Sequence, residues 1–408
     1  MVASNGFTGM LGFVIFSPIM QLSGRKFVYH VQNMFHIVGW IMFLLANNIT
    51  ALFAARLLHG FSIGVIYITC MIIGEYSDPK RRGYFTTIKK AAIAFAILMC
   101  HASALILDWR RIATLAIILP TISIFLTIFW PESPSYLAMK GRFKESEESF
   151  VWLHGGSNMK ELQDLLSSQK QIQENKSSEK WYKFLSRKDF LKPFAIVSIL
   201  TLLLDLCGKY YFVIYVIQIM VKLLGDKSIA IYCTLGADIL STVALIFSGV
   251  VISSMKRRTI LFTFGPAIVV IMLLIWVVIV LKLSAWMTPA LILLQTFIIN
   301  LSLIPVAFAL MGEVFPLEHK GIGSCATGIV FTLLYTITLR LAPFLMENTG
   351  VAGVYAIYGI CIAVCLVILY FLVPETKDKT LQEIENEFKG IKRADDDRLS
   401  INHVFVNK

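Results

Sequence analysis

Long apolar runs recur along the whole chain and restrict what it can fold into. A helix needs about 20 apolar residues to cross the hydrocarbon core of a bilayer, and backbone polar groups in lipid must pair within the helix. The sequence therefore predicts a polytopic, all-α membrane protein. Eleven candidate spans cover residues 6–22, 31–46, 52–73, 91–107, 112–130, 193–221, 229–252, 259–281, 288–311, 322–346 and 351–373.

The composition agrees with membrane spans and disfavours soluble functions. Hydrophobic residues make up 57% of the chain and charged residues 15%, well below the quarter that is usual in soluble domains. The net charge of +11 comes from basic stretches between apolar runs, so nucleic acid is not an expected partner. The sequence shows no metal-ligand spacing, phosphate loop or hydrolase motif. We therefore expect neither an enzyme nor a metal or cofactor site.

The basic residues also predict the orientation in the membrane. Most of them lie in alternate loops, which places those loops in the cytoplasm. The C-terminus is then cytoplasmic and the N-terminus is outside. The polar segment 131–192 is expected to join two bundles through short amphipathic helices within 140–155 and 159–175. One more short helix is expected at 381–388.

Three pairs of motifs reveal an internal repeat. GEYSDPKRRG at 74–83 matches GEVFPLEHKG at 312–321, SGRK at 23–26 matches MKRR at 255–258, and PESP at 131–134 matches PETK at 374–377. All three landmarks are cytoplasmic in both copies. This indicates a parallel repeat about an axis along the membrane normal, as in the two halves of major-facilitator transporters. The expected division is a five-helix bundle (1–130), a linker (131–192), a six-helix bundle (193–373) and a tail (374–408).

Only one span precedes the basic landmark in the first half, whereas two precede it in the second. The first helix of the major-facilitator pattern is therefore expected to be missing from this chain.

Several motifs resemble the sugar porter family of the major facilitator superfamily, nearest to the insect facilitated trehalose transporter-like proteins. VPETKDKTLQEIE at 373–385 is similar to the family's C-terminal signature, and FWPESPSYLAMKGR at 129–142 to its mid-chain signature. Arg56 with Gly60, and Trp109-Arg110 with Pro120, match further family positions. The resemblance implies alternating-access transport of a small solute, a trehalose-like or hexose-like sugar, by a monomer in the plasma membrane. Facilitated diffusion and coupling to protons both remain open.

Departures from the family pattern concern the sugar site. The family's seventh-helix amides, which bind sugar hydroxyls, are replaced in LDLCGKY at 204–210, where only Gly208 is retained. Lys90 stands at a glutamine position, and Phe308 ends a Pro-Val-Ala-Phe segment where the family has tryptophan. Unpaired sugar hydroxyls would cost about 1–3 kcal/mol each. The alternatives are a charged organic solute, a non-transporting sensor-like relative, or part of a longer transporter.

Charged residues at membrane depth usually face a cavity or a partner. Those expected in this chain are Lys89, Lys90, Asp205, Lys209, Asp238 and Arg340. Asp205 and Lys209 are four residues apart, so they can instead neutralise each other on one helix face. Asp238 must find its partner in the tertiary structure. The predicted solute-binding residues are Lys90, Asp205, Gly208, Tyr210, Tyr211 and Phe308, although packing is the alternative role for the aromatic ones.

The repeated cytoplasmic motifs supply glutamates and basic residues at matched positions. We expect them to form ion pairs that brace the cytoplasmic side and break as the halves rock, the alternative being that they only set topology. The predicted gating residues are Arg25, Glu75, Arg82, Glu132, Arg257, Arg258, Glu313, Lys320 and Glu375.

Overall fold

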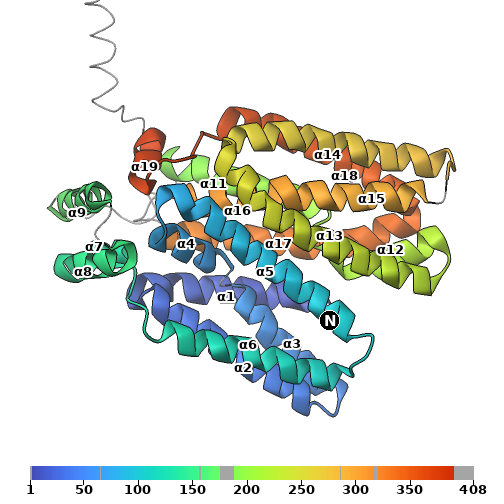
Figure 1. Cartoon of the computed structure of the whole chain (residues 1–408), viewed down its shortest axis with the longest axis horizontal. Helices are drawn as coiled ribbons and strands as arrows, with labels where there is room; N and C mark the ends of the chain where they lie inside the picture. Colours follow the sequence, from blue (N-terminus) through green and yellow to red (C-terminus); the bar gives the residue numbers. More distant parts are fainter. Residues whose placement is uncertain are drawn as a thin grey trace, which may run out of the picture.

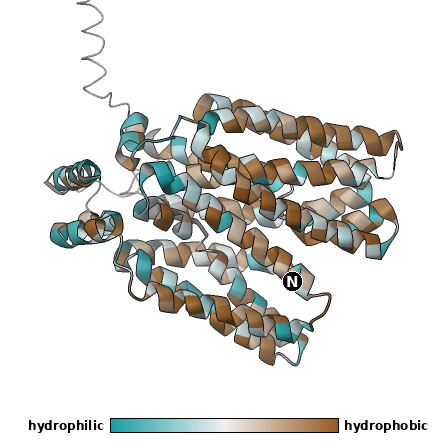
Figure 2. Ribbon diagram, in the orientation of Figure 1, coloured by the Kyte–Doolittle hydropathy of each residue, from teal (hydrophilic) through white to brown (hydrophobic). Residues whose placement is uncertain are grey.

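The computed structural model of the protein describes residues 2–64, 66–155, 158–174, 188–284, 286–315 and 320–389. These residues form helices and connecting turns, without a strand. Ten helical segments among them are long and apolar enough to cross a membrane. Hydrophobic residues cover most of the length of the long helices, whereas hydrophilic residues gather at their ends (Figure 2). The predicted all-α membrane class is confirmed.

The first half consists of α1 (Val2–Ser23), α2 (Arg25–Leu45), α3 (Ile49–Ile63), α4 (Ile66–Tyr76), α5 (Pro79–Ser103) and α6 (Trp109–Thr127). The predicted span 52–73 is not one regular helix in the described residues: α3 ends at Ile63 and the chain turns at Gly64, before α4 begins at Ile66. At this point α3 crosses α1 closely. A Cβ on Gly64 would lie 2.2 Å from the Gly12 carbonyl carbon, so only glycine allows the backbones of α1 and α3 to come this close together.

The second half consists of α11 (Lys188–Leu206), α12 (Tyr211–Leu224), α13 (Lys227–Ser254), α14 (Arg257–Val280), α15 (Met287–Ile298), η1 (Ile299–Leu303), α16 (Ile304–Glu313), α17 (Lys320–Asn348) and α18 (Gly350–Leu372). Two predicted spans are again not regular helices. The span 193–221 breaks between α11 and α12, where Gly208 takes a φ of 93°. The span 288–311 contains the π-helical turn η1, which ends where the Ile304 N–H donates to the Ile299 carbonyl, just before Pro305.

Helix contacts follow the predicted repeat. Helix α2 packs on α6 in the first half, and the equivalent helices α14 and α18 pack together in the second. The halves meet along two long seams, α1 against α17 and α5 against α13. Figure 1 shows the first half in blue to teal and the second half in green to red. The architecture of two bundles in a parallel repeat is confirmed.

Four short helices gather at one end of the molecule (Figure 1). They are α7 (Pro134–Met139), α8 (Phe143–His154), α9 (Met159–Glu174) and α19 (Leu381–Lys389), of which all but α7 were predicted. The His154 ring lies 2.8 Å from the Asp78 carboxylate, which attaches α8 to the loop before α5. The rest of the predicted linker and tail, residues 175–187 and 390–408, lies outside the described residues.

Candidate functional site: a cavity between the halves and charge clusters at one end of the molecule

A cavity of about 340 Å³ lies between α5 of the first half and several helices of the second. Its size falls at the lower end of the roughly 300–1,000 Å³ that is usual for small-molecule sites. Most of its lining is apolar. The polar lining residues are Lys90, Lys209, Tyr210, Tyr211, Asp238, Ser241, Gln295, Thr296, Asn300, Tyr335 and Tyr355.

Both interrupted helices of the second half open onto this cavity. The turn after α11 contributes Gly208 and its neighbours, and η1 contributes Ile299 and Asn300. A broken helix exposes backbone groups that a regular helix would pair internally. One of them, the Cys207 carbonyl, accepts a hydrogen bond of 3.3 Å from the Gln295 side-chain amide. The irregular backbone is thus concentrated where a solute would be in contact.

Two lysines from opposite halves converge on one aromatic ring beside the cavity. The Lys90 ammonium of α5 lies 3.1 Å from the centre of the Phe308 ring, and the Lys209 ammonium lies 3.8 Å from it. Such cation–π contacts contribute about 0.5–2 kcal/mol each. The arrangement places two basic side chains at the interface between the bundles.

The predicted solute-binding residues separate into two groups. Lys90, Gly208, Tyr210 and Tyr211 line the cavity, whereas Asp205 and Phe308 are not among the lining residues. Phe308 instead supports the two lysines. Tyr210 and Tyr211 also pack edge-on against aromatic rings of α17 and α18.

Asp205 is 1% exposed, and its carboxylate oxygens accept no hydrogen bond from the described residues. No ion pair joins it to Lys209 in the described part of the chain. The expected pairing assumed one continuous helix. Because α11 ends at Leu206 and Gly208 turns the backbone, a spacing of four residues no longer places the two side chains one helical turn apart.

Several polar residues of the cavity lining were not predicted, among them Gln295 and Asn300. Gln295 and Asn300 are amides within an apolar span, which is the signal that could have identified them. A contact across the halves was not predicted either: His101 Nδ1 of α5 lies 2.6 Å from the Asp238 carboxylate of α13. This contact provides the tertiary partner that Asp238 required. Sequence could not supply its identity, because the two residues are far apart along the chain.

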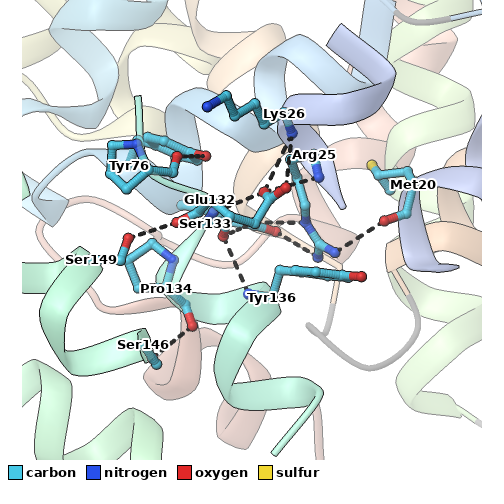
Figure 3. A network of polar contacts seen from close by, with 12 residues as sticks. Met20, Arg25, Lys26, Tyr76, Glu132, Ser133, Pro134, Tyr136, Ser146 and Ser149 are labelled. Atoms are coloured by element: carbon cyan, nitrogen blue, oxygen red, sulfur yellow. Dashed lines mark hydrogen bonds and ion pairs between the residues drawn. The ribbon is translucent and has the colours of Figure 1, made fainter. Parts of the chain in front are cut away.

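The repeated charged motifs of the first half form one buried network (Figure 3). The Arg25 guanidinium forms a bidentate ion pair with the Glu75 carboxylate, with N–O distances of 2.9 and 3.1 Å. The Ser133 hydroxyl donates a hydrogen bond of 2.6 Å to the same carboxylate. Glu132 accepts hydrogen bonds from the backbone N–H groups of Arg25 and Lys26. A carboxylate at these free donors stabilises the start of α2.

The second half repeats this network with one difference. Glu375 accepts from the backbone N–H groups of Arg257 and Arg258, each at 3.1 Å, as Glu132 does in the first half. The Arg257 guanidinium, however, lies 3.9 Å from Glu313, a looser contact than its counterpart. The second copy therefore holds its charges less tightly.

Charged groups also bridge the two halves and the linker. Arg82 is buried and its guanidinium lies 3.9 Å from Glu161 of α9. Burial raises the pKa of the Glu161 carboxyl above its usual value, although Arg82 opposes this change. A Cβ on Gly83 would lie 2.8 Å from the Arg257 guanidinium, so α5 lies directly against the charged cluster of the second half. The Lys320 side chain, also a predicted gating residue, lies outside the described part of the chain.

The two Gly-Glu motifs of the repeat face each other at this end of the molecule. A Cβ on Gly74 of α4 would lie 3.4 Å from the Gly312 carbonyl oxygen, and a Cβ on Gly312 of α16 would lie 3.1 Å from the Cys70 carbonyl oxygen. The halves are thus in backbone contact on the side of the charge clusters.

The arrangement of two repeated bundles around a cavity agrees with the comparisons with known proteins. The family model described as "Sugar (and other) transporter" matches residues 1–388. The chain belongs to this family. The resemblance to sugar porters is therefore confirmed.

Similar proteins include facilitated trehalose transporters of insects. The one from Polypedilum vanderplanki is 25% identical over 94% of this chain and 77% of its own length. That of Apis mellifera ligustica is also 25% identical, with 78% of its length covered. The chain spans only 43% of the similar transporter of Drosophila virilis. These relatives are transporters by name, not enzymes.

Among solved structures, the proton:xylose symporter XylE bound to 6-bromo-6-deoxy-D-glucose has the same fold. Its TM-score is 0.84 at 17% sequence identity, with 95% of this chain and 88% of that chain covered.

Proposed function

We propose that the protein transports a small sugar-like solute across the plasma membrane by alternating access. The observation that carries this proposal is the cavity between two bundles that contact each other along α1 with α17 and α5 with α13. The halves 1–130 and 193–373 would rock about the cavity as a monomer, with α19 on the cytoplasmic side. The names of the similar insect transporters favour trehalose or a hexose as the first solutes to test.

The polar groups of the cavity suit a hydroxylated solute. Asn300 donates hydrogen bonds to the Ser241 hydroxyl at 3.2 Å and to the Thr296 carbonyl at 2.8 Å. The Gln295 carbonyl oxygen has no hydrogen-bond partner among the described residues. A sugar hydroxyl that donates to this oxygen would satisfy a buried acceptor, which contributes about 1 kcal/mol or more.

Uptake by reconstituted vesicles tests the proposal. Vesicles that contain the purified protein should accumulate labelled trehalose or D-glucose faster than protein-free vesicles. Gln295→Leu should reduce uptake about tenfold, because it removes an amide from the solute site. Lys222→Gln, an exposed change at the end of α12, should leave uptake unchanged. Uptake equal to that of protein-free vesicles for every solute would favour a non-transporting, sensor-like role.

An imposed pH gradient distinguishes the two forms of coupling. Facilitated diffusion predicts the same initial uptake rate with and without the gradient. Proton coupling predicts uptake that increases when the outer solution is more acidic.

A further inference from the structure

We infer that the cavity binds the anionic group of its solute between Lys90 and Lys209. This inference rests on the proposed transport function and narrows it to a sugar that carries a carboxylate or a phosphate. Several ionisable side chains gather near the Phe308 ring. Lys89, Lys90 and Lys209 bring three basic side chains to this region, and Asp205 brings one acidic side chain.

The three lysine side chains have no carboxylate within ion-pair distance in the described part of the chain. Lys89 donates to the Cys70 sulfur at 3.7 Å, a weak contact. Lys90 and Lys209 make cation–π contacts with Phe308, but neither side-chain nitrogen forms an ion pair or a hydrogen bond with the described residues. Lys90 is 5% exposed, so water provides little compensation. Unpaired charge at membrane depth is costly, and a bound anion would remove that cost.

The position of the two lysines couples anion binding to the contact between the halves. Lys90 belongs to α5 of the first half, whereas Lys209 belongs to the turn after α11 in the second. Both line the cavity. An anion between them is attracted to both bundles at once, and an ammonium on a flexible stem suits a carboxylate or phosphate as a point charge.

The rest of the lining determines the size and kind of the solute. Beyond the lysines, the cavity presents the hydroxyl and amide groups of Ser241, Gln295, Thr296, Asn300 and Tyr335. These groups can form hydrogen bonds with a polyhydroxylated solute, whereas an apolar solute would leave them unpaired. Asp238, the other carboxylate of the lining, is already paired with His101 and therefore repels the anion less. The solute class is a hexose-sized anionic sugar.

Ligand-dependent thermal unfolding of the purified full chain tests the inference without requiring transport. The probes are D-glucuronate, D-glucose 6-phosphate and D-glucose. At least one of the two anions should bind about tenfold more tightly than glucose, because a charge-assisted contact contributes at least this much. The stronger of the two anions identifies the carboxylate or the phosphate as the preferred group. Equal or stronger stabilisation by glucose would overturn the inference.

Variants locate the anion site. Lys90→Gln and Lys209→Gln should each remove the preference for the anion while glucose binding stays within about twofold. Lys222→Gln removes a lysine far from the cavity and should keep the preference of the parent. An anion preference that survives in both cavity variants, or disappears in Lys222→Gln, would contradict the proposed site. Circular dichroism of each variant verifies that it is folded.

Uptake by vesicles then separates the two proposals. Uptake of glucose without uptake of either anion would leave the transport function in place and overturn the anion site. Anion-selective binding that depends on Lys90 and Lys209, without uptake of any solute, would support the anion site and contradict transport.

Discussion

Arg25 and Glu75 form an ion pair whose side chains are only 1% and 0% exposed. Removal of one member of a buried pair leaves the other charge without compensation, which costs about 3–5 kcal/mol. Glu75→Gln should therefore lower the midpoint of thermal unfolding of the purified protein by several degrees. The exposed pair of Arg142 and Glu145 provides a control, since Glu145→Gln should leave the midpoint unchanged. Equal effects of the two changes would show that burial does not determine the contribution of the pair.

The same network shows which roles of single residues can be predicted from the sequence repeat. The pairing of Arg25 with Glu75 was predictable because both recur in the second half as Arg257 and Glu313. The role of Gly24 was not, since its counterpart is Lys256. Gly24 has a φ of 101°, and a Cβ there would lie 2.2 Å from a Glu132 carboxylate oxygen, so glycine is required in this copy alone.

At the scale of helices, the crossing of α1 and α3 depends on glycine. A Cβ on Gly12 would lie 2.2 Å from the Phe61 carbonyl oxygen, which is backbone and cannot rotate away. Gly12→Ala should therefore separate the two helices and destabilise the protein by about 1–3 kcal/mol in thermal unfolding. Gly236→Ala on α13 is the matched control, because a Cβ there meets no atom within 4 Å. The control should be neutral or stabilising by up to about 1 kcal/mol, owing to the better helix propensity of alanine.

The linker helix α9 contacts α5 through Glu161, which lies near Arg82. The strength of this contact should depend on pH. The pKa of Glu161 is raised by burial, so the docked state binds a proton more readily than the undocked state does. Docking should therefore strengthen as the pH falls from 7 towards the raised pKa, despite the loss of attraction to Arg82. Hydrogen exchange of the α9 amides, measured at several pH values, should show greater protection at the lower values.

Glu161→Gln removes the titrating group and should make the protection of α9 independent of pH in this range. Asp164→Asn, a neighbouring change on the same helix, should retain most of the dependence. Protection that increases with pH in the parent would mean that the attraction to Arg82 exceeds the cost of burying the carboxylate.

Helix interruptions were the part of the fold that sequence patterns did not predict. The runs at 52–73, 193–221 and 288–311 are apolar throughout, and hydropathy detects only that a segment suits lipid. It does not detect a backbone turn that Gly208 permits or a π-helical turn before Pro305, since both are buried among other helices. The two interruptions of the second half line the cavity. The sequence therefore located the spans well and the details of the site poorly.

At the scale of the whole molecule, alternating access requires that the contact between α4 and α16 can open and close. A Cβ on Gly312 would approach the Cys70 carbonyl oxygen to 3.1 Å, so the larger side chain of Gly312→Val should keep the two helices apart. The population should then shift towards the state that is open to the cytoplasm. Cys70 is 3% exposed in the closed arrangement and serves as a natural reporter of this opening.

Maleimide labelling of Cys70, followed by mass spectrometry, measures the shift. In Gly312→Val the label should reach Cys70 faster from the cytoplasmic face, whereas Gly236→Val should match the parent. Cys207 lines the cavity and should be labelled more slowly from the outer face, because one state gains population at the expense of the other. Faster labelling of both cysteines from both faces would indicate loosened packing rather than a change of access. That result would mean that the glycine contact holds the bundles together without acting as a gate.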